Sequence, residues 1–111
     1  MKDILFILKA PFVDGDQSWY CNDCATIEGA LLANPHWADK VDVRRIAFPR
    51  PRWEVVDMVG EAHQGLPMLV MDAKGAPMHA LKVNDKYAIL KDIREIGWAL
   101  ATRHGGVGPH P

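Results

Sequence analysis

The sequence predicts an α/β fold built on one small mixed sheet with helices on both faces. Short apolar runs of strand length alternate along the 111 residues with segments whose apolar positions have helical spacing. The first run, Ile4–Leu8, is apolar without interruption, as is expected of a strand buried on both faces. Strands joined through helices pair in parallel with right-handed crossovers, whereas a later hairpin adds antiparallel neighbours. A single domain of this length, with 49% hydrophobic residues, is large enough for a modest core.

Each element rests on a local signal. Proline, glycine and aspartate break the pattern after the first strand and predict a loop, and Asn34-Pro35 ends the first helix. Pro49 and Pro51 impose an extended turn after the second strand. A glycine-containing segment between two later apolar runs predicts a hairpin, and one apolar stripe predicts a long last helix.

In chain order the predicted elements are a strand at 4–8, a loop at 11–19, a helix at 22–33, a strand at 41–48, a helix at 53–61, strands at 68–71 and 78–83 joined through 73–76, and a helix at 85–102. The order is β-α-β-α-β-β-α, which corresponds to a four-stranded mixed sheet in one domain at 1–104. A flexible C-terminal tail is expected at 105–111.

Composition and charge narrow the classes of function. The 13 basic and 14 acidic residues give a net charge of −1, which argues against a nucleic-acid binder, since neutralising phosphates needs a basic face. No apolar run approaches the length that spans a membrane. The opening segment is too short and too acidic for a signal peptide. We therefore expect a cytoplasmic monomer or homodimer without nucleic-acid or membrane partners, whose cysteines a reducing environment keeps as thiols.

The two cysteines, Cys21 and Cys24, are the only ones in the chain and stand three apart at the start of the first predicted helix. This spacing lets the second thiol attack a disulfide formed at the first, which a dithiol oxidoreductase requires. The free N–H groups and the dipole of a helix N-terminus favour a thiolate at Cys21. The carboxylates of Asp14, Asp16 and Asp23 oppose it by like-charge repulsion. Helix starts expose the first residue and bury the one three positions later, so we expect Cys21 to attack and Cys24 to resolve the mixed disulfide.

The Cys-x-x-Cys pair after the first strand, together with Gly65-Leu66-Pro67 before the third, resembles the thioredoxin-like superfamily over residues 1–104. Within it the chain resembles a small bacterial family of unknown function, and it is similar to glutaredoxins and to the N-terminal domain of glutathione transferases. The resemblance implies a cis peptide bond before Pro67 and a Leu66 backbone turned toward Cys21, where it pairs with a thiol peptide as an added strand. Alternatively, Pro67 simply starts a strand.

Residues 81–90 are similar to the segment that opens the last helix in the thioredoxin-like half of glutathione transferases. The resemblance implies that Asp85 binds the γ-glutamyl end of glutathione, although the serine of that family is replaced by Lys86 here. Alternatively, Asn84 or Asp85 serves only as a helix N-cap. The all-helical second domain of those transferases has no counterpart in this chain, so a separate site for a hydrophobic transferase substrate is not expected.

Two arginines are candidates for holding a ligand near the dithiol. Arg50 and Arg52 follow the second strand, and the carboxyl ends of parallel strands share one edge of a sheet, so both are expected beside Cys21. There they bind a carboxylate of glutathione or of an acidic partner. Alternatively, they pair with Glu54 and Asp57 at the surface.

Two further features bear on the chemistry of the dithiol. Trp19 and Tyr20 precede it, where thioredoxins also carry aromatic residues; they shield the sulfur or offer a flat docking surface, or alternatively pack against the sheet. The first strand lacks the buried acid that thioredoxins place behind the second cysteine. Proton transfer to Cys24 therefore needs Asp23, Lys9 or water.

The sequence thus predicts thiol–disulfide exchange at Cys21 and Cys24, with glutathione, another small thiol or a protein disulfide as partner and no other cofactor assigned. Two alternatives stay open. The dithiol binds a metal or an iron–sulfur cluster, with His63 as a further ligand; since one cysteine pair cannot fill a closed zinc site, such a site bridges two subunits. Otherwise the chain is a thioredoxin-like interaction module with little turnover, in which an exposed Trp37 or Trp53 belongs to a dimer face.

Overall fold

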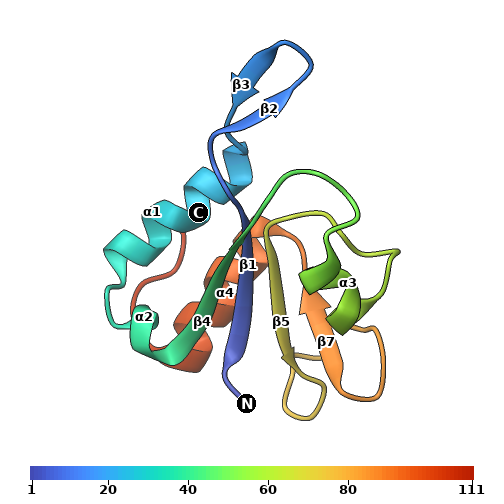
Figure 1. The fold of residues 1–111 in the computed structure, drawn as a ribbon. Helices are drawn as coiled ribbons and strands as arrows, with labels where there is room; N and C mark the ends of the chain where they lie inside the picture. Colours follow the sequence, from blue (N-terminus) through green and yellow to red (C-terminus); the bar gives the residue numbers. More distant parts are fainter.

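A computed structural model, which describes residues 1–111, shows an α/β domain with a five-stranded mixed sheet and helices on both of its faces (Figure 1). The elements in chain order are β1 (Asp3–Leu8), β2 (Phe12–Asp14), β3 (Gln17–Trp19), α1 (Asn22–Ala33), α2 (Trp37–Lys40), β4 (Val41–Ile46), α3 (Trp53–Val59), β5 (Met68–Asp72), β6 (Leu81–Lys82), β7 (Tyr87–Leu90) and α4 (Ile93–His104). The longest helices, α1 and α4, have 12 residues each, and no helix has the length and apolar composition needed to cross a membrane.

The strand order in the sheet is β4-β1-β5-β7-β6. β4 pairs with β1 in parallel, with Leu5 opposite Val43, whereas β5 runs antiparallel to both β1 and β7. β1, β4 and β7 therefore point the same way, and their carboxyl ends meet at one end of the sheet, where the segment leading into β5 also lies. We call this the carboxyl end of the sheet, and the end where β1, β4 and β7 begin the amino end.

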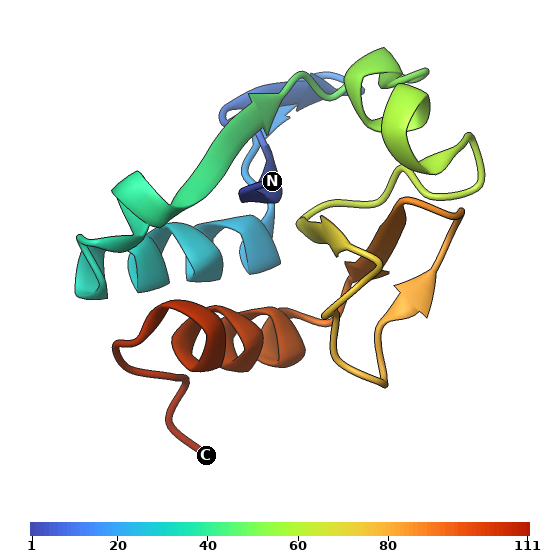
Figure 2. The ribbon, with the colours of Figure 1, turned by 90° about the horizontal axis from the view of Figure 1, so that it is seen from below.

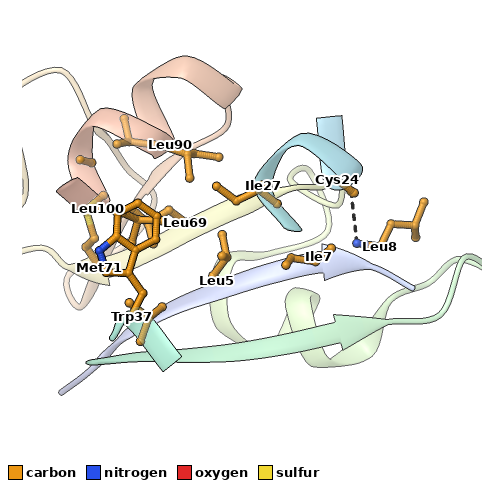
Figure 3. Close-up of a cluster of buried hydrophobic side chains, with 13 residues drawn as sticks. Leu5, Ile7, Leu8, Cys24, Ile27, Trp37, Leu69, Met71, Leu90 and Leu100 are labelled. Carbon is orange, nitrogen blue, oxygen red and sulfur yellow. Dashed lines mark hydrogen bonds between the residues drawn. The ribbon is translucent and has the colours of Figure 1, made fainter. Parts of the chain in front are cut away.

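β1 is buried on both faces, as its uninterrupted apolar run predicts. Leu5 and Ile7 belong to the largest cluster of buried side chains, which α1, α2 and α4 cover (Figure 3). Ile4 and Phe6 belong to a second cluster on the opposite face, which α3 covers. Figure 2 shows α1 and α4 side by side on one face of the sheet and α3 on the other. This alternation follows from the two-residue period of a strand, and each such buried side chain stabilises the fold by roughly 1.5–3 kcal/mol.

The predicted helix at 85–102 is wrong in its first part. Its beginning forms β7, which pairs with β5, and α4 starts only at Ile93. Ile89 has helical spacing to Ile93, but it belongs to a short buried apolar run that fits a strand equally well. Asp92 caps α4, because its carboxylate accepts the N–H groups of the two residues after Ile93 (3.0 Å each). The strand predicted at 78–83 is reduced to β6, which pairs with β7 at the sheet edge and not with β5 through the predicted hairpin at 73–76. Because β7 is a strand rather than the start of a helix, the sheet has five strands instead of four.

The predicted loop at 11–19 contains a two-stranded hairpin, β2–β3, which extends beyond the carboxyl end of the sheet (Figure 1). Gly15 stands at the first of two turn positions with a φ of +69°, a value that two-residue hairpin turns require and glycine adopts freely. Phe12, in the strand nearer β1, stacks on Phe48 with ring centroids 4.5 Å apart. The indole N–H of Trp19 donates to a carbonyl of the opposite strand (3.0 Å). The hairpin is therefore anchored to the domain on one side and braced within itself.

The C-terminal tail at 105–111 was expected to be flexible, but hydrogen bonds join it to the domain. The Asn34 side chain donates to the Val107 carbonyl (3.2 Å) and accepts the Val107 N–H (2.8 Å). The indole N–H of Trp37 donates to the Gly105 carbonyl (2.7 Å). Trp37 is fully buried, so its expected place in an exposed dimer face is wrong, whereas Trp53 is exposed.

Candidate active site at the dithiol

The dithiol lies at the carboxyl end of the sheet, where α1 begins. Cys21 has extended backbone angles (φ −80°, ψ 123°) and is the N-cap of α1. Its sulfur accepts the backbone N–H of Cys24 (3.2 Å), a place usually taken by a side-chain oxygen. That N–H and the positive end of the helix dipole both stabilise negative charge on the sulfur.

Cys24 is the buried member of the pair. It is 2% exposed and belongs to the core cluster on the α1 face, whereas Cys21 is partly exposed. The Leu8 N–H donates to the Cys24 sulfur (3.3 Å; Figure 3). The pKa of the Cys24 thiol is raised to about 12. Burial is the largest cause and the hydrogen bond with Cys21 the next, whereas the Leu8 N–H opposes the rise. The expected exposure pattern is confirmed: Cys21 is partly exposed and Cys24 is buried.

A main-chain carbonyl faces the accessible sulfur from the segment that leads into β5. The Leu66–Pro67 peptide bond is cis, as predicted, and Pro67 is buried. The Cys21 sulfur lies 3.9 Å from the Leu66 carbonyl oxygen, the distance of a weak S–H···O contact. Backbone groups of Leu66 are thus placed beside any disulfide that forms at Cys21.

An open pocket of about 350 Å³ borders both sulfurs along α1, and its wall is mostly apolar. The lining residues are Leu8, Ala10, Tyr20, Cys21, Cys24, Ala25, Glu28, Gly29 and Leu32. Tyr20 is 66% exposed and Leu32 83% exposed, so Tyr20 does not pack against the sheet. An apolar group bound in this pocket would lie directly beside the dithiol.

The structure gives the two candidate arginines different environments. Arg50 is exposed and takes part in none of the ion pairs. Arg52 is 7% exposed, and its guanidinium donates to the carbonyl oxygens of Phe48 (3.0 and 2.8 Å) and Gln64 (2.7 Å). These donors are used within the protein, so the predicted binding of a ligand carboxylate by Arg52 is not supported. The alternative, an ion pair with Glu54, is not formed either, because that carboxylate pairs with an arginine of β4.

Asp85 lies far from the dithiol. It is in the turn between β6 and β7, where the Asn84 side chain accepts the N–H groups of the two residues after Asp85 (2.9 Å each). Because β7 runs in the same direction as β1, this turn is at the amino end of the sheet, whereas Cys21 is at the carboxyl end. The prediction that Asp85 opens the last helix is wrong, since Asp92 caps that helix. The structure therefore does not bring Asp85 to the site where it was expected to bind glutathione.

One carboxylate of β1 is buried, but at the strand end opposite Cys24. Asp3 is 3% exposed; its oxygens accept from the Arg103 guanidinium (2.7 and 2.8 Å), and one lies 2.8 Å from His104 Nε2. Burial alone raises the pKa of Asp3, but the hydrogen bonds with Arg103 and His104 outweigh it and lower the pKa. The carboxylate that affects the second cysteine is that of Asp23, whose negative charge contributes to the raised pKa of Cys24.

The sequence offers no signal for the apolar pocket or for the carbonyl partners of Arg52, because both depend on segments that are distant along the chain. The hairpin has a local signal, Gly15-Asp16, because glycine at the first position favours a two-residue turn. Within the chain, no group of three or more His, Cys, Asp or Glu side chains lies close enough together to hold a metal ion. His63, the further ligand expected for such a site, is partly buried, and its Nδ1 atom has no hydrogen-bond partner.

Comparison with known proteins gives one match. Residues 2–108 match the family described as "Protein of unknown function (DUF3088)", which covers nearly the whole chain. No curated protein and no solved structure matches the sequence.

Proposed function

The chain belongs to the DUF3088 family, and we propose that it is a thiol–disulfide oxidoreductase in which Cys21 attacks and Cys24 resolves. One observation carries the proposal: an accessible sulfur caps α1, and a second, buried sulfur lies one turn behind it. Cysteines that only fill a core have no need for this asymmetry. The Leu66 carbonyl beside the accessible sulfur adds a position where the backbone of a bound substrate can pair.

The reaction proceeds in two exchange steps. The Cys21 thiolate attacks one sulfur of a substrate disulfide, forms a mixed disulfide and releases the other substrate sulfur as a thiolate. The Cys24 thiolate then attacks the Cys21 sulfur, displaces the second substrate thiolate and closes the Cys21–Cys24 disulfide. Two electrons pass from the dithiol to the substrate, and the two released thiolates take up the two protons that the cysteines give up.

The raised pKa of Cys24 sets the order of these steps. At neutral pH the Cys24 thiol is protonated, so it does not compete with Cys21 for the substrate. Part of the rise comes from the hydrogen bond and the charge of Cys21, and this part is lost once Cys21 is held in a mixed disulfide. The Asp23 carboxylate or the departing substrate thiolate then accepts the proton of Cys24.

We also propose that the fold is thioredoxin-like, and the order of the elements supports this. When the β2–β3 hairpin, the short α2 and the edge strand β6 are set aside, the remaining elements follow the order β-α-β-α-β-β-α. The dithiol follows the first of these strands and Pro67 precedes the third, as the resemblance in sequence implies. The hairpin and the fifth strand are the additions that distinguish this chain from the four-stranded pattern.

The surroundings of Cys21 favour a polypeptide disulfide as the substrate. The Leu66 carbonyl lies beside the Cys21 sulfur, and Tyr20 contributes to the mostly apolar pocket that borders both sulfurs. A substrate with an apolar side chain next to its cysteine fills that pocket. Of the charged residues expected to bind glutathione, only Arg50 is both at the carboxyl end of the sheet and left without another partner in the structure. We therefore propose glutathione as the cytoplasmic reductant rather than as the bound substrate. Two glutathione thiols reduce the Cys21–Cys24 disulfide and leave as oxidised glutathione.

Equilibration in glutathione buffers tests the proposal. The protein is held at a series of ratios of reduced to oxidised glutathione, and its free thiols are trapped with an alkylating mass tag. We expect a reversible transition between about −270 and −120 mV, the range of known dithiol oxidoreductases. Cys24→Ser should accumulate a mixed disulfide at Cys21, and Cys21→Ser should form neither product. A pair that stays reduced at every ratio would contradict the proposal, and a pair protected by co-purified zinc or iron would replace it with metal binding.

A further inference from the structure

Arg52 is the only positively charged side chain that is buried in this chain. It is 7% exposed, and the other buried polar residues are Asp3 and Asn34. Its Nε, Nη1 and Nη2 atoms donate to the carbonyl oxygens of Phe48 and Gln64 at 2.7–3.0 Å. No carboxylate is among these partners, although a buried charge is normally paired with an opposite one.

Other arginines of the chain are satisfied differently. Arg44, Arg45 and Arg103 each bond to a carboxylate, and these hydrogen bonds raise the pKa of each guanidinium. The pKa of Arg52 is lowered instead, first by burial and then by the charge of Arg50. Arg52 thus carries a positive charge whose loss of solvation no carboxylate offsets.

Arg52 is tied to the two segments that flank the dithiol. Its bond to Gln64 holds the segment that continues to Leu66, whose carbonyl oxygen is 3.9 Å from the Cys21 sulfur. Its bonds to Phe48 hold the segment after β4, and its guanidinium carbon lies 5.6 Å from the centre of the Phe48 ring. Phe48 follows β4 and Leu66 precedes β5, so both lie with Cys21 at the carboxyl end of the sheet. The guanidinium therefore belongs to the same corner of the molecule as the accessible sulfur.

Few charged groups act in this corner. Negative charge on Cys24 and on Cys21 raises the pKa of Arg52, and the one positive charge that lowers it is that of Arg50. The carboxylate that acts on the dithiol is Asp23, and its effect is on Cys24. Because the Cys24 thiol is protonated at neutral pH, the anion available to Arg52 is the Cys21 thiolate.

We propose that Arg52 is a positioning residue whose positive charge stabilises the Cys21 thiolate, and that this thiolate is the counter-ion that the buried guanidinium otherwise lacks. Its role in catalysis rests on the proposed thiol–disulfide exchange, whereas the charge interaction itself does not. In a poorly solvated corner the attraction between the two groups is stronger than in water. When the Cys21–Cys24 disulfide closes, the negative charge is lost. Arg52 therefore favours the reduced dithiol and raises its reduction potential.

Alkylation of Cys21 measures this charge interaction directly. In a Cys24→Ser background, the rate of reaction with iodoacetamide is followed from acidic to alkaline pH. We expect Arg52→Met to slow the reaction at neutral pH by about tenfold and to move the rise of the rate to higher pH, because the thiolate loses a nearby opposite charge. Arg52→Lys keeps the charge and should stay within about threefold of the parent. Arg44→Met is the matched control: it removes an arginine of β4 that pairs with surface carboxylates, and we expect the parent profile.

A purely structural role of Arg52 gives a different result. Arg52→Gln can donate to the neighbouring carbonyls but carries no charge, so it separates hydrogen bonding from electrostatics. Coinciding alkylation profiles of Arg52→Gln and Arg52→Lys would overturn the inference, even if Arg52→Met does not fold. A folded Arg52→Met with the parent profile would overturn it as well. Circular dichroism and thermal unfolding identify the variants that are folded.

The redox equilibrium separates this inference from the proposed function. In the chain with both cysteines, Arg52→Met should change the equilibrium constant with glutathione by about tenfold toward the oxidised pair, which equals a potential lower by about 30 mV. If the wild-type dithiol does not exchange with disulfides but Arg52 still controls the alkylation of Cys21, the proposed function fails and the inference stands. If the wild type exchanges and Arg52→Met behaves like it in both measurements, the inference alone fails.

Discussion

The two ends of the sheet each bury one charged side chain, and they satisfy it in different ways. At the amino end, Asp3 is enclosed by Arg103 and His104, so both carboxylate oxygens have a charged or hydrogen-bonding partner. At the carboxyl end, Arg52 has only neutral carbonyl partners, in the corner that holds Cys21. A paired charge joins two segments of the chain, whereas an unpaired charge can act on a group whose own charge changes during a reaction. We therefore expect the buried charge at the amino end to stabilise the fold and the one at the carboxyl end to act in the proposed chemistry.

The largest expected effect comes from removing the accessible sulfur at the carboxyl end. Cys21→Ser should lower the rate of disulfide exchange by more than about a thousandfold, because the hydroxyl cannot replace the thiolate as nucleophile. Its free energy of unfolding should change little, since Cys21 is only partly buried. Reduction of a chromogenic disulfide, followed by absorbance, measures the rate, with Cys24→Ser as the variant that still performs the first step. Equal rates for Cys21→Ser and the wild type would remove the chemical half of the comparison.

The next effect tests the amino end. Asp3→Asn leaves Arg103 and His104 without their counter-charge, so we expect the free energy of unfolding to fall by about 3 kcal/mol while the exchange rate is unchanged. Urea denaturation measures the loss. Asp42→Asn is the matched control, because its pair with Arg44 is partly exposed and should contribute less than about 1 kcal/mol. A loss for Asp3→Asn as small as that of the control would show that the buried cluster does not stabilise this end.

Acid titration sharpens the same contrast. Burial raises the pKa of Asp3, but the hydrogen bonds with Arg103 and His104 outweigh it and hold the pKa below its usual 3.8. The stability that Asp3 contributes is therefore complete above the unfolded-state pKa and is lost as the pH falls below about 4 toward the folded-state pKa. Urea denaturation at successively lower pH should show the difference in stability between the wild type and Asp3→Asn narrowing over that interval. A difference that stays constant throughout the acid range would contradict the assignment.

The smallest effect is expected at alkaline pH and belongs to the carboxyl end. Burial, aided by Cys21, raises the pKa of Cys24 from 9.0 to about 12, so the folded chain keeps a proton that the unfolded chain loses. The stability that Cys24 contributes is complete below the unfolded-state pKa and is lost as the pH rises from 9.0 toward about 12. In Cys21→Ser, where burial remains, Cys24 should resist iodoacetamide in mildly alkaline buffer unless urea unfolds the protein, as mass spectrometry would show. Rapid alkylation of the folded variant would mean that the second sulfur is not protected.

The first helix shows how much of the site local sequence predicts. Its bounds, Asn22–Ala33, agree with the predicted range, and Cys21 caps it with the sulfur accessible while Cys24 is buried. Helix periodicity and the unsatisfied N–H groups of a first turn are properties of neighbouring residues, so they can be recognised without the rest of the chain. The cis bond at Pro67 is predicted instead by the resemblance of the whole pattern to a known superfamily, and the structure has it.

The last third of the chain shows where local signals are insufficient. Tyr87–Leu90 fits both a helical stripe and a buried strand, and only its pairing with β5 decides between them. That decision moves Asp85 into a turn at the amino end and removes it from the dithiol. Because a strand is stabilised by partners that are distant in sequence, its neighbours along the chain do not determine it.

By itself, the sequence determined the fold class, the dithiol at a helix start and the burial of β1, because periodicity and capping are encoded by adjacent residues. Only the tertiary structure decided which charges are paired. Arg103 meets Asp3 across 100 positions of the chain, and Arg52 is enclosed by two segments that the sheet brings to one end. Whether a charged side chain meets a carboxylate or only carbonyl oxygens depends on which segments pack around it, and packing is a property of the whole chain.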